Sequence, residues 1–212
     1  MEAACSGARE ALERGLERSR LEGRPCAVAV LDLDRFTSGL RAQGWEASAE
    51  PLVAALERTI RARVEAGGGS VSRYGRDAFL LVWPGEGPEA ALARLEELRR
   101  HLASAPISVI GPAGRVEAAL TFSAGVASFP RDADEPTELV CLAWDALAVA
   151  KSQGGGRTLL APQRPMKLKT TYYLPCQLDV LSRLAERLKR TEASLLREAL
   201  EDMIQKYDLL PR

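Results

Sequence analysis

Ser70-Val-Ser-Arg-Tyr-Gly-Arg-Asp-Ala-Phe-Leu-Leu-Val-Trp83 is the stretch that decides the fold of the larger part of this chain. Two runs of strand-forming residues, 70–74 and 79–83, flank Gly75-Arg-Asp77, whose composition favours a tight turn. The pattern therefore predicts a β-hairpin. An earlier apolar run, 26–33, predicts a buried strand that leads into acidic residues.

Apolar residues recur at helical spacing on both sides of these strands. The stripes predict helices over 6–21, 45–64, 89–102 and 138–151, the last capped by Thr137 after Pro136. Further strands are predicted over 120–128 and 158–161. This alternation predicts an α/β (α+β) sandwich in which helices flank a mixed sheet.

A domain boundary is predicted at Pro162-Gln-Arg-Pro165, a stiff connector that is poor in backbone donors. It divides the chain into a domain over 1–161, a linker over 162–165 and a domain over 166–212.

Composition excludes several classes of protein. The chain has 29 basic and 29 acidic residues, so net charge gives no argument for nucleic-acid binding. No run approaches the roughly 18–20 apolar residues that span a bilayer. The four cysteines show no C-x-x-C spacing, and His101, the single histidine, has no metal-ligand partner at helical spacing. We therefore expect a cytoplasmic protein with reduced thiols.

Four patches of the first domain, in order, resemble the GGDEF domain, the fold of diguanylate cyclases. They are Asp32-Leu-Asp-Arg-Phe36, Arg73-Tyr-Gly-Arg-Asp-Ala-Phe79, Thr121-Phe-Ser-Ala-Gly-Val126 and Asp145-Ala-Leu-Ala-Val-Ala-Lys151. The resemblance implies a fold with a mixed sheet and flanking helices. It also implies metal ligation by Asp32 and Asp77, since hard cations prefer oxygen ligands. Nucleotide-binding positions that survive are Arg73, Gly75, Lys151 and Arg157.

The sequence departs from the family pattern where the chemistry would occur. The second glycine and the following glutamate of the signature are Arg76 and Ala78, and the guanine-reading positions are Leu40 and Ala49. The family's inhibitory product site, an R-x-x-D motif, has Ala66 and Gly69 in place of its arginine and aspartate. Gly155 stands where the family has a further arginine. We therefore expect no enzyme activity and no required cofactor, with a nucleotide or Mg²⁺ as the possible occupant of a vestigial site.

The C-terminal domain carries a different pattern. Residues 167–174 alternate with period two, Pro175 follows, and two amphipathic helices are predicted over 176–189 and from Thr191 onward. This resembles the ribbon-helix-helix (Arc/MetJ/CopG-like) family of DNA-binding domains. The resemblance implies an intertwined homodimer, because one strand and two short helices cannot bury their apolar faces alone.

That second resemblance gives the main prediction of function, a dimeric, sequence-specific DNA-binding regulator associated with the nucleoid. Its double-stranded DNA contacts would be Lys167, Lys169, Thr171 and Tyr173 on the ribbon, with Arg190, Thr191 and Ser194 at a phosphate. The GGDEF-like domain would regulate or oligomerise it. Two alternatives stay open: a sensor of GTP or cyclic di-GMP (or a weak nucleotidyl cyclase) using Asp32 and Asp77, and a scaffold that serves only assembly.

Overall fold

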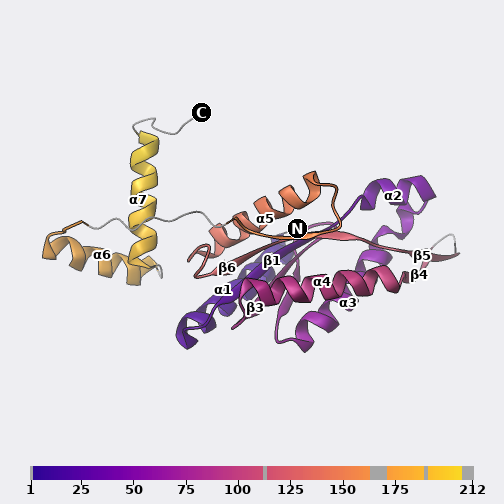
Figure 1. Cartoon of the computed structure of the whole chain (residues 1–212), viewed down its shortest axis with the longest axis horizontal. Coiled ribbons are helices and arrows are strands. Elements are labelled where there is room, and N and C mark those ends of the chain that lie inside the picture. The colour runs from indigo at the N-terminus through magenta and orange to yellow at the C-terminus, as the bar shows by residue number, and fades with distance from the viewer. Residues whose placement is uncertain (1, 112–113, 163–170, 189–190, 207–212) are drawn as a thin grey trace. The chain divides into compact units, whose positions relative to one another are not determined.

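The protein divides into two compact units, Met1–Gln163 and Arg164–Arg212. The computed structural model describes residues 2–111, 114–162, 171–188 and 191–206 (Figure 1). Within these residues no helix is long and apolar enough to cross a membrane.

A five-stranded mixed sheet forms the centre of the first unit. Its strands, in spatial order, are β2 (Ser70–Arg73), β3 (Ala78–Pro84), β1 (Cys26–Leu33), β6 (Phe122–Phe129) and β7 (Thr158–Leu160). The first four pair antiparallel with their neighbours, whereas β6 and β7 are parallel. The predicted mixed sheet is confirmed.

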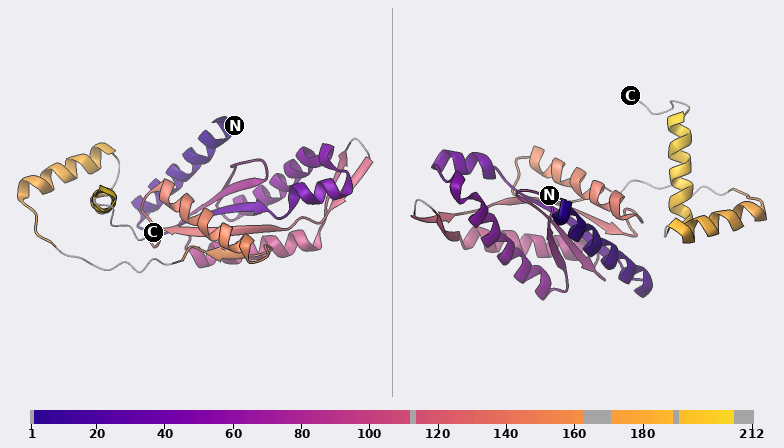
Figure 2. Two further views of the ribbon diagram at one scale, coloured as in Figure 1. Left: turned by 90° about the horizontal axis from the view of Figure 1, so that it is seen from above. Right: turned by 180° about the vertical axis from the view of Figure 1, so that it is seen from behind.

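Helices cover both faces of this sheet (Figures 1 and 2). They are α1 (Glu2–Glu22), α2 (Phe36–Gln43), the 3₁₀ turn η1 (Glu46–Ser48), α3 (Ala49–Ala66), α4 (Pro88–Ser104) and α5 (Pro136–Ser152). Alternate residues of β1 supply the two cores, because successive side chains of a strand point to opposite faces. Ala29 and Leu31 join the core beneath α3 and α4, whereas Val28 and Val30 join the core beneath α1 and α5. Burial on both faces explains why β1 is apolar almost throughout.

Several element boundaries differ from the predictions. The helix predicted over 45–64 begins at Ala49, after η1. The predicted Thr137 cap is wrong, because α5 already begins at Pro136 and Glu135 lies at its N-cap position in an extended conformation. Proline suits the first helical position, where its missing N–H is not needed.

The prediction overlooked two elements. Helix α2 has few apolar residues, with Phe36 and Leu40 the ones buried, so its periodicity is weak. A separate hairpin joins β4 (Ile107–Gly111) to β5 (Gly114–Ala118), and the strand predicted over 120–128 proves to be β6, which begins at Phe122.

The second unit contains α6 (Pro175–Leu188) and α7 (Glu192–Lys206). Of the predicted strand 167–174, residues 171–174 form no strand here, and 167–170 lie outside the described residues. The strand was predicted to pair with the same strand of a second copy, and a lone strand has no partner for its backbone groups, so the ribbon stays a prediction. Most large apolar side chains of the unit are exposed; Ala185 and Leu195 are the buried ones among those described.

Candidate functional site

The carboxylates of the site lie at one end of the central strands. Asp32 pairs in register with Ala78 of β3 and Ser123 of β6. The next residue, Leu33, donates its backbone N–H to the Asp77 carbonyl oxygen at 3.2 Å. This bond holds the end of β1 against the hairpin turn that carries Asp77. The two aspartates that the sequence singles out therefore meet at the same edge of the sheet.

A pocket of about 620 Å³ opens at this edge. Its lining is Asp32, Leu33, Arg35, Phe36, Thr37, Ser38, Arg41, Asp77 and Lys151. Three basic and two acidic side chains thus face one space. Such a mixture suits a ligand that brings both negative charge and a cation, as a nucleotide with its metal does.

Lys151 is the direct partner of Asp32. Its ammonium group donates to the Asp32 carboxylate and, at 3.4 Å, to the Leu33 carbonyl oxygen. Burial raises the pKa of the Asp32 carboxyl above its ordinary value. The hydrogen bond and charge of Lys151 lower this pKa, while the charges of Asp77 and Asp34 raise it. A cation at this place therefore offsets the cost of a carboxylate whose side chain is only 16% exposed.

The first turn of α2 forms another wall of the pocket. Arg35 precedes it with φ 50° and ψ 26°, a left-handed conformation that is costly for a residue with a side chain. This conformation turns the chain from β1 directly into α2. The first amides of a helix have no acceptor within the helix, so they favour anions. Phe36, Thr37 and Ser38 supply that turn to the pocket.

Arg73 braces the hairpin turn rather than facing the pocket. Its guanidinium donates to both oxygens of Glu50, to the Gly75 carbonyl oxygen at 3.2 Å and to the Arg76 carbonyl oxygen at 2.7 Å. The turn is closed further by Gly75 N–H, which donates to the Ala78 carbonyl oxygen at 3.2 Å. Among the pocket-lining residues the hairpin contributes Asp77, but neither Arg73 nor Gly75.

Arg157 lies outside the pocket, whereas Lys151 lines it, although the sequence predicts both as nucleotide-binding residues. Arg157 donates to the Gln153 side chain at 3.0 Å and to the Gly155 carbonyl oxygen at 3.3 Å, and it is not among the residues that line the pocket. Gly155 has φ 76°, and a Cβ there would lie 2.8 Å from a carboxylate oxygen of Asp34. Glycine at this position therefore adopts the positive φ at low cost and leaves room for the Asp34 carboxylate.

The positions that depart from the family pattern are mostly packed. Leu40 and Ala49 belong to the core beneath α3 and α4, and Ala78 is 4% exposed. Arg76 is exposed on the turn. The residues that sequence reasoning missed are Arg35, Thr37, Ser38 and Arg41. Their spacing along a helix could have grouped them, had α2 been predicted.

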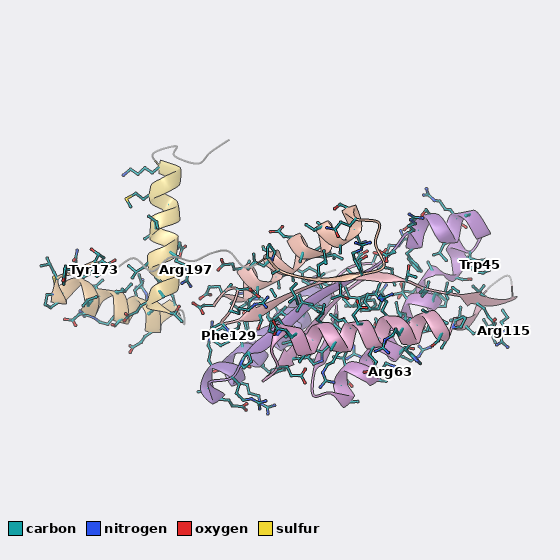
Figure 3. The ribbon with its side chains drawn as sticks, in the orientation of Figure 1. Trp45, Arg63, Arg115, Phe129, Tyr173 and Arg197 are labelled. Carbon is teal, nitrogen blue, oxygen red and sulfur yellow. The ribbon has the colours of Figure 1, made fainter. Side chains whose placement is uncertain are left out.

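The predicted DNA-contact residues form no site within the described residues. Thr171 and Tyr173 are exposed and precede α6, where Figure 3 labels Tyr173. Thr191 precedes α7, and its carbonyl oxygen accepts from Leu195 N–H at 3.2 Å. Lys167, Lys169 and Arg190 lie outside the described residues, and the side chain of Ser194 is likewise not described.

Comparisons with known proteins identify the first unit. The model of the "Diguanylate cyclase, GGDEF domain" family matches residues 6–157. The bifunctional diguanylate cyclase/cyclic di-GMP phosphodiesterase MucR of Pseudomonas aeruginosa is 32% identical over 143 residues, which are 68% of this chain and 20% of MucR. The chain thus spans about a fifth of the length of that relative.

Solved structures give the same result. The GGDEF domain of TpbB (YfiN) from Pseudomonas aeruginosa is 25% identical with a TM-score of 0.64, covering 73% of this chain and 87% of that chain. The GGDEF domain of DgcB from Caulobacter crescentus, solved in complex with c-di-GMP, is also 25% identical with a TM-score of 0.64. That match covers 74% of this chain and 87% of the DgcB chain.

These findings correct the main prediction of function. The prediction of a DNA-binding transcriptional regulator is wrong, because the match over most of the chain is to diguanylate cyclase domains and supports neither DNA binding nor transcription regulation. That prediction gave more weight to a short C-terminal pattern than to the larger domain. The chain belongs to the GGDEF domain family of diguanylate cyclases.

Proposed function

We propose that the GGDEF domain of this protein binds a nucleoside triphosphate together with Mg²⁺ and acts as a nucleotide sensor that does not cyclise its ligand. One observation carries the proposal: Asp32, Asp77 and Lys151 line the same pocket as the first turn of α2. These groups come from four separate elements, and together they offer oxygen ligands for a cation and donors for phosphates.

The residues present fit a magnesium ion. The Asp32 carboxylate and the Leu33 carbonyl oxygen already converge on a positive charge, the ammonium group of Lys151. Asp77 adds a second carboxylate to the same pocket, and within the described residues no hydrogen bond engages its side chain. Asp32 and Asp77 would hold the ion, which when bound neutralises phosphate charge. Two carboxylates with additional water or phosphate ligands are typical of magnesium sites.

The chain's own residues would bind the phosphates. The amides of the first turn of α2 lie at the pocket, and Arg35 and Arg41 add positive charge from the start and the next turn of that helix. Lys151 would shift from Asp32 toward a phosphate when a metal takes its place. Each of these interactions recognises the phosphate chain rather than the base.

Two sets of substitutions support binding without cyclisation. Ala78 stands where the family resemblance places the glutamate that assists the chemistry, and a methyl group cannot transfer a proton. Leu40 and Ala49 stand at the guanine-reading positions, and both are buried apolar side chains. Without hydrogen-bonding groups there, the pocket should discriminate weakly between guanine and adenine.

The proposal is tested by product analysis combined with thermal unfolding. We expect Mg²⁺ with GTP, and with ATP to a similar extent, to raise the melting temperature of the full-length protein. Ligand at about a hundred times Kd stabilises the folded state by about 2.7 kcal/mol. Chromatography and mass spectrometry of the same mixture should detect no cyclic dinucleotide. Accumulation of cyclic di-GMP would show that the protein is a cyclase, and the absence of any thermal shift would reject the nucleotide site.

For the C-terminal unit we propose a ribbon-helix-helix fold that pairs with a second copy of the chain to form a homodimer. The observation that favours this partner is an apolar surface on a very small unit. Its described and exposed apolar side chains are Tyr172, Tyr173, Leu174, Leu178, Val180, Leu188, Leu196, Leu200 and Met203. A unit of this size rarely holds a core of its own, and an identical unit presents a matching apolar surface.

The molar mass of the full-length protein in solution tests the dimer. Light scattering is expected to give twice the chain mass for the wild type and the chain mass for Leu196→Glu with Leu200→Glu, which places charge on the exposed apolar surface. Arg187→Gln is the control, because it removes one positive charge at an exposed position of α6 and should leave the dimer intact. A monomeric wild type would contradict the proposal.

A further inference from the structure

Both carboxylate oxygens of Asp34 accept hydrogen bonds from the protein, and Asp34 lies outside the nucleotide pocket. The Ser123 hydroxyl donates to one oxygen at 2.7 Å, and the Gly156 N–H donates to the other at 2.8 Å. The Asp34 backbone N–H donates in turn to the Thr121 carbonyl oxygen at 2.9 Å. Asp34 is not among the residues that line the pocket, whereas its neighbours Leu33 and Arg35 are.

These three bonds join segments that are far apart in the sequence. Asp34 follows β1, Ser123 lies on β6, and Gly156 lies in the loop between α5 and β7. Hydrogen bonds to a carboxylate are shorter than those between neutral groups and roughly twice as strong. The Asp34 side chain therefore fixes the turn after β1 against both its neighbour in the sheet and the end of α5.

The loop after α5 is built around this carboxylate. Gly154, Gly155 and Gly156 have φ values of 105°, 76° and 64°, a region that only glycine adopts at low cost. A Cβ on Gly155 would approach the Asp34 carboxylate to 2.8 Å. The loop is also tied to α5, because Gly155 N–H donates to the Ala150 carbonyl oxygen and Gly154 N–H to that of Lys151, both at 3.1 Å. The contact with Asp34 thus reaches the last turn of α5, which carries Lys151.

We infer that Asp34 is a positioning residue of the nucleotide site: it holds the end of α5 against the turn after β1, so that Lys151 stays in contact with Asp32 at the pocket. The inference rests on the proposed function, since it names a residue that supports the same site. It assigns Asp34 no contact with the ligand. A direct role as a metal ligand is disfavoured because Asp34 does not line the pocket and its carboxylate is directed to Ser123 and Gly156.

The two obvious substitutions at Asp34 separate geometry from charge. Asparagine keeps one oxygen that can accept from Gly156 N–H and one amide that can donate to the Ser123 hydroxyl, which also has acceptor lone pairs. Alanine removes both contacts. Asp145→Ala is a matched control, because Asp145 is an exposed aspartate on α5 and lies outside the pocket.

Hydrogen exchange of the full-length protein, without nucleotide, tests the structural half of the inference. In Asp34→Ala we expect the Gly156 amide to lose protection, and the peptide that covers 152–158 to exchange faster. Asp34→Asn and Asp145→Ala should keep the wild-type rates. Wild-type protection at Gly156 in a folded Asp34→Ala protein would overturn the inference. If Asp34→Ala fails to fold, Ser123→Ala is measured in its place; its Gly156 amide should exchange faster than in the wild type, because the carboxylate loses one of the two contacts that orient it, and unchanged exchange would overturn the inference.

Calorimetric titration with Mg²⁺ and GTP tests the functional half. We expect Asp34→Ala to weaken binding by at least about tenfold, as loss of a group that orients ligating residues typically does. Asp34→Asn should recover most of that loss, and Asp145→Ala should match the wild type. Equal affinity in folded Asp34→Ala and wild type would overturn the inference. A wild type that binds no nucleotide would instead reject the proposed function, and hydrogen exchange would still decide whether Asp34 fixes the loop.

Discussion

At the scale of the residue, burial and a neighbouring positive charge shift the pKa of a carboxyl group in opposite directions. Asp32 is the main example: burial raises the pKa of its carboxyl, and the neighbouring ammonium group of Lys151 lowers it. The site therefore keeps an anion at a costly place and holds a cation beside it. That arrangement accommodates a metal ion or a lysine, and it explains why a buried carboxylate persists at the end of β1.

At Cys26, where no cation is nearby, burial raises the pKa of the thiol with little to oppose it. It raises the pKa of the Cys26 thiol to about 11, and a hydrogen bond with Ser19 lowers it in part. Cys26 is fully buried, whereas Cys141 and Cys176 are exposed. We expect iodoacetamide to modify Cys141 and Cys176 in the native protein and to leave Cys26 unmodified until unfolding, as measured by peptide mass spectrometry. Rapid modification of native Cys26 would contradict its burial.

The same thiol makes a stability prediction with a defined sign. Because the pKa is higher in the folded state, the unfolded state loses its proton first as the pH rises. Stability is therefore intact below the unfolded pKa, whose ordinary value is 9.0, and declines as the pH rises through that value toward the folded one. The contribution lost is about 2–3 kcal/mol. Urea unfolding at several pH values measures it, and Cys26→Ala, which has no thiol, should lack this component.

At the scale of the element, close packing of α5 on β6 depends on one glycine. A Cβ on Gly125 would lie 2.0 Å from the Ala143 carbonyl oxygen and 2.4 Å from the Leu147 nitrogen, both in the backbone of α5. We expect Gly125→Ala to reduce the free energy of unfolding by about 3 kcal/mol or more, since helix and strand must separate. Urea unfolding measures the change.

Gly39→Ala is the control for this prediction. Gly39 lies inside α2, and nothing stands within 4 Å of a Cβ placed there. Alanine favours a helix over glycine by up to about 1 kcal/mol, so this variant should be as stable as the wild type or more so. Equal stability of Gly125→Ala and Gly39→Ala would show that α5 does not pack as described.

Elements with a strong period could be predicted, and those whose order depends on tertiary contacts could not. The hairpin around Gly75, the buried strand β1 and helices α3, α4 and α5 follow from apolar spacing and turn residues. Helix α2 escaped prediction because it is short and mostly polar, and its start depends on the left-handed Arg35. Because α2 was not predicted, the predicted site lacked Arg41 and the first turn of α2, which line the pocket.

At the scale of the whole molecule, the two resemblances did not have equal weight. Four motifs in order identified the GGDEF fold, and the structure places three of them at strands β1, β2–β3 and β6 and the fourth on helix α5. The C-terminal pattern rests on one short alternating run and two helices, which many small units share. Pattern alone could not say whether its exposed faces meet DNA, a protein or a second copy, so the regulatory function inferred from it was wrong.

The central claim is that Asp32 and Asp77 give this GGDEF domain a working nucleotide–Mg²⁺ site. Its most direct test is calorimetric titration of the full-length protein with GTP, with and without Mg²⁺, in the wild type, Asp77→Asn and the control Asp145→Asn. We predict binding that requires Mg²⁺ in the wild type and the control, and a loss of at least about tenfold in Asp77→Asn. Binding that is equally strong in Asp77→Asn, or that ignores Mg²⁺, would contradict the claim.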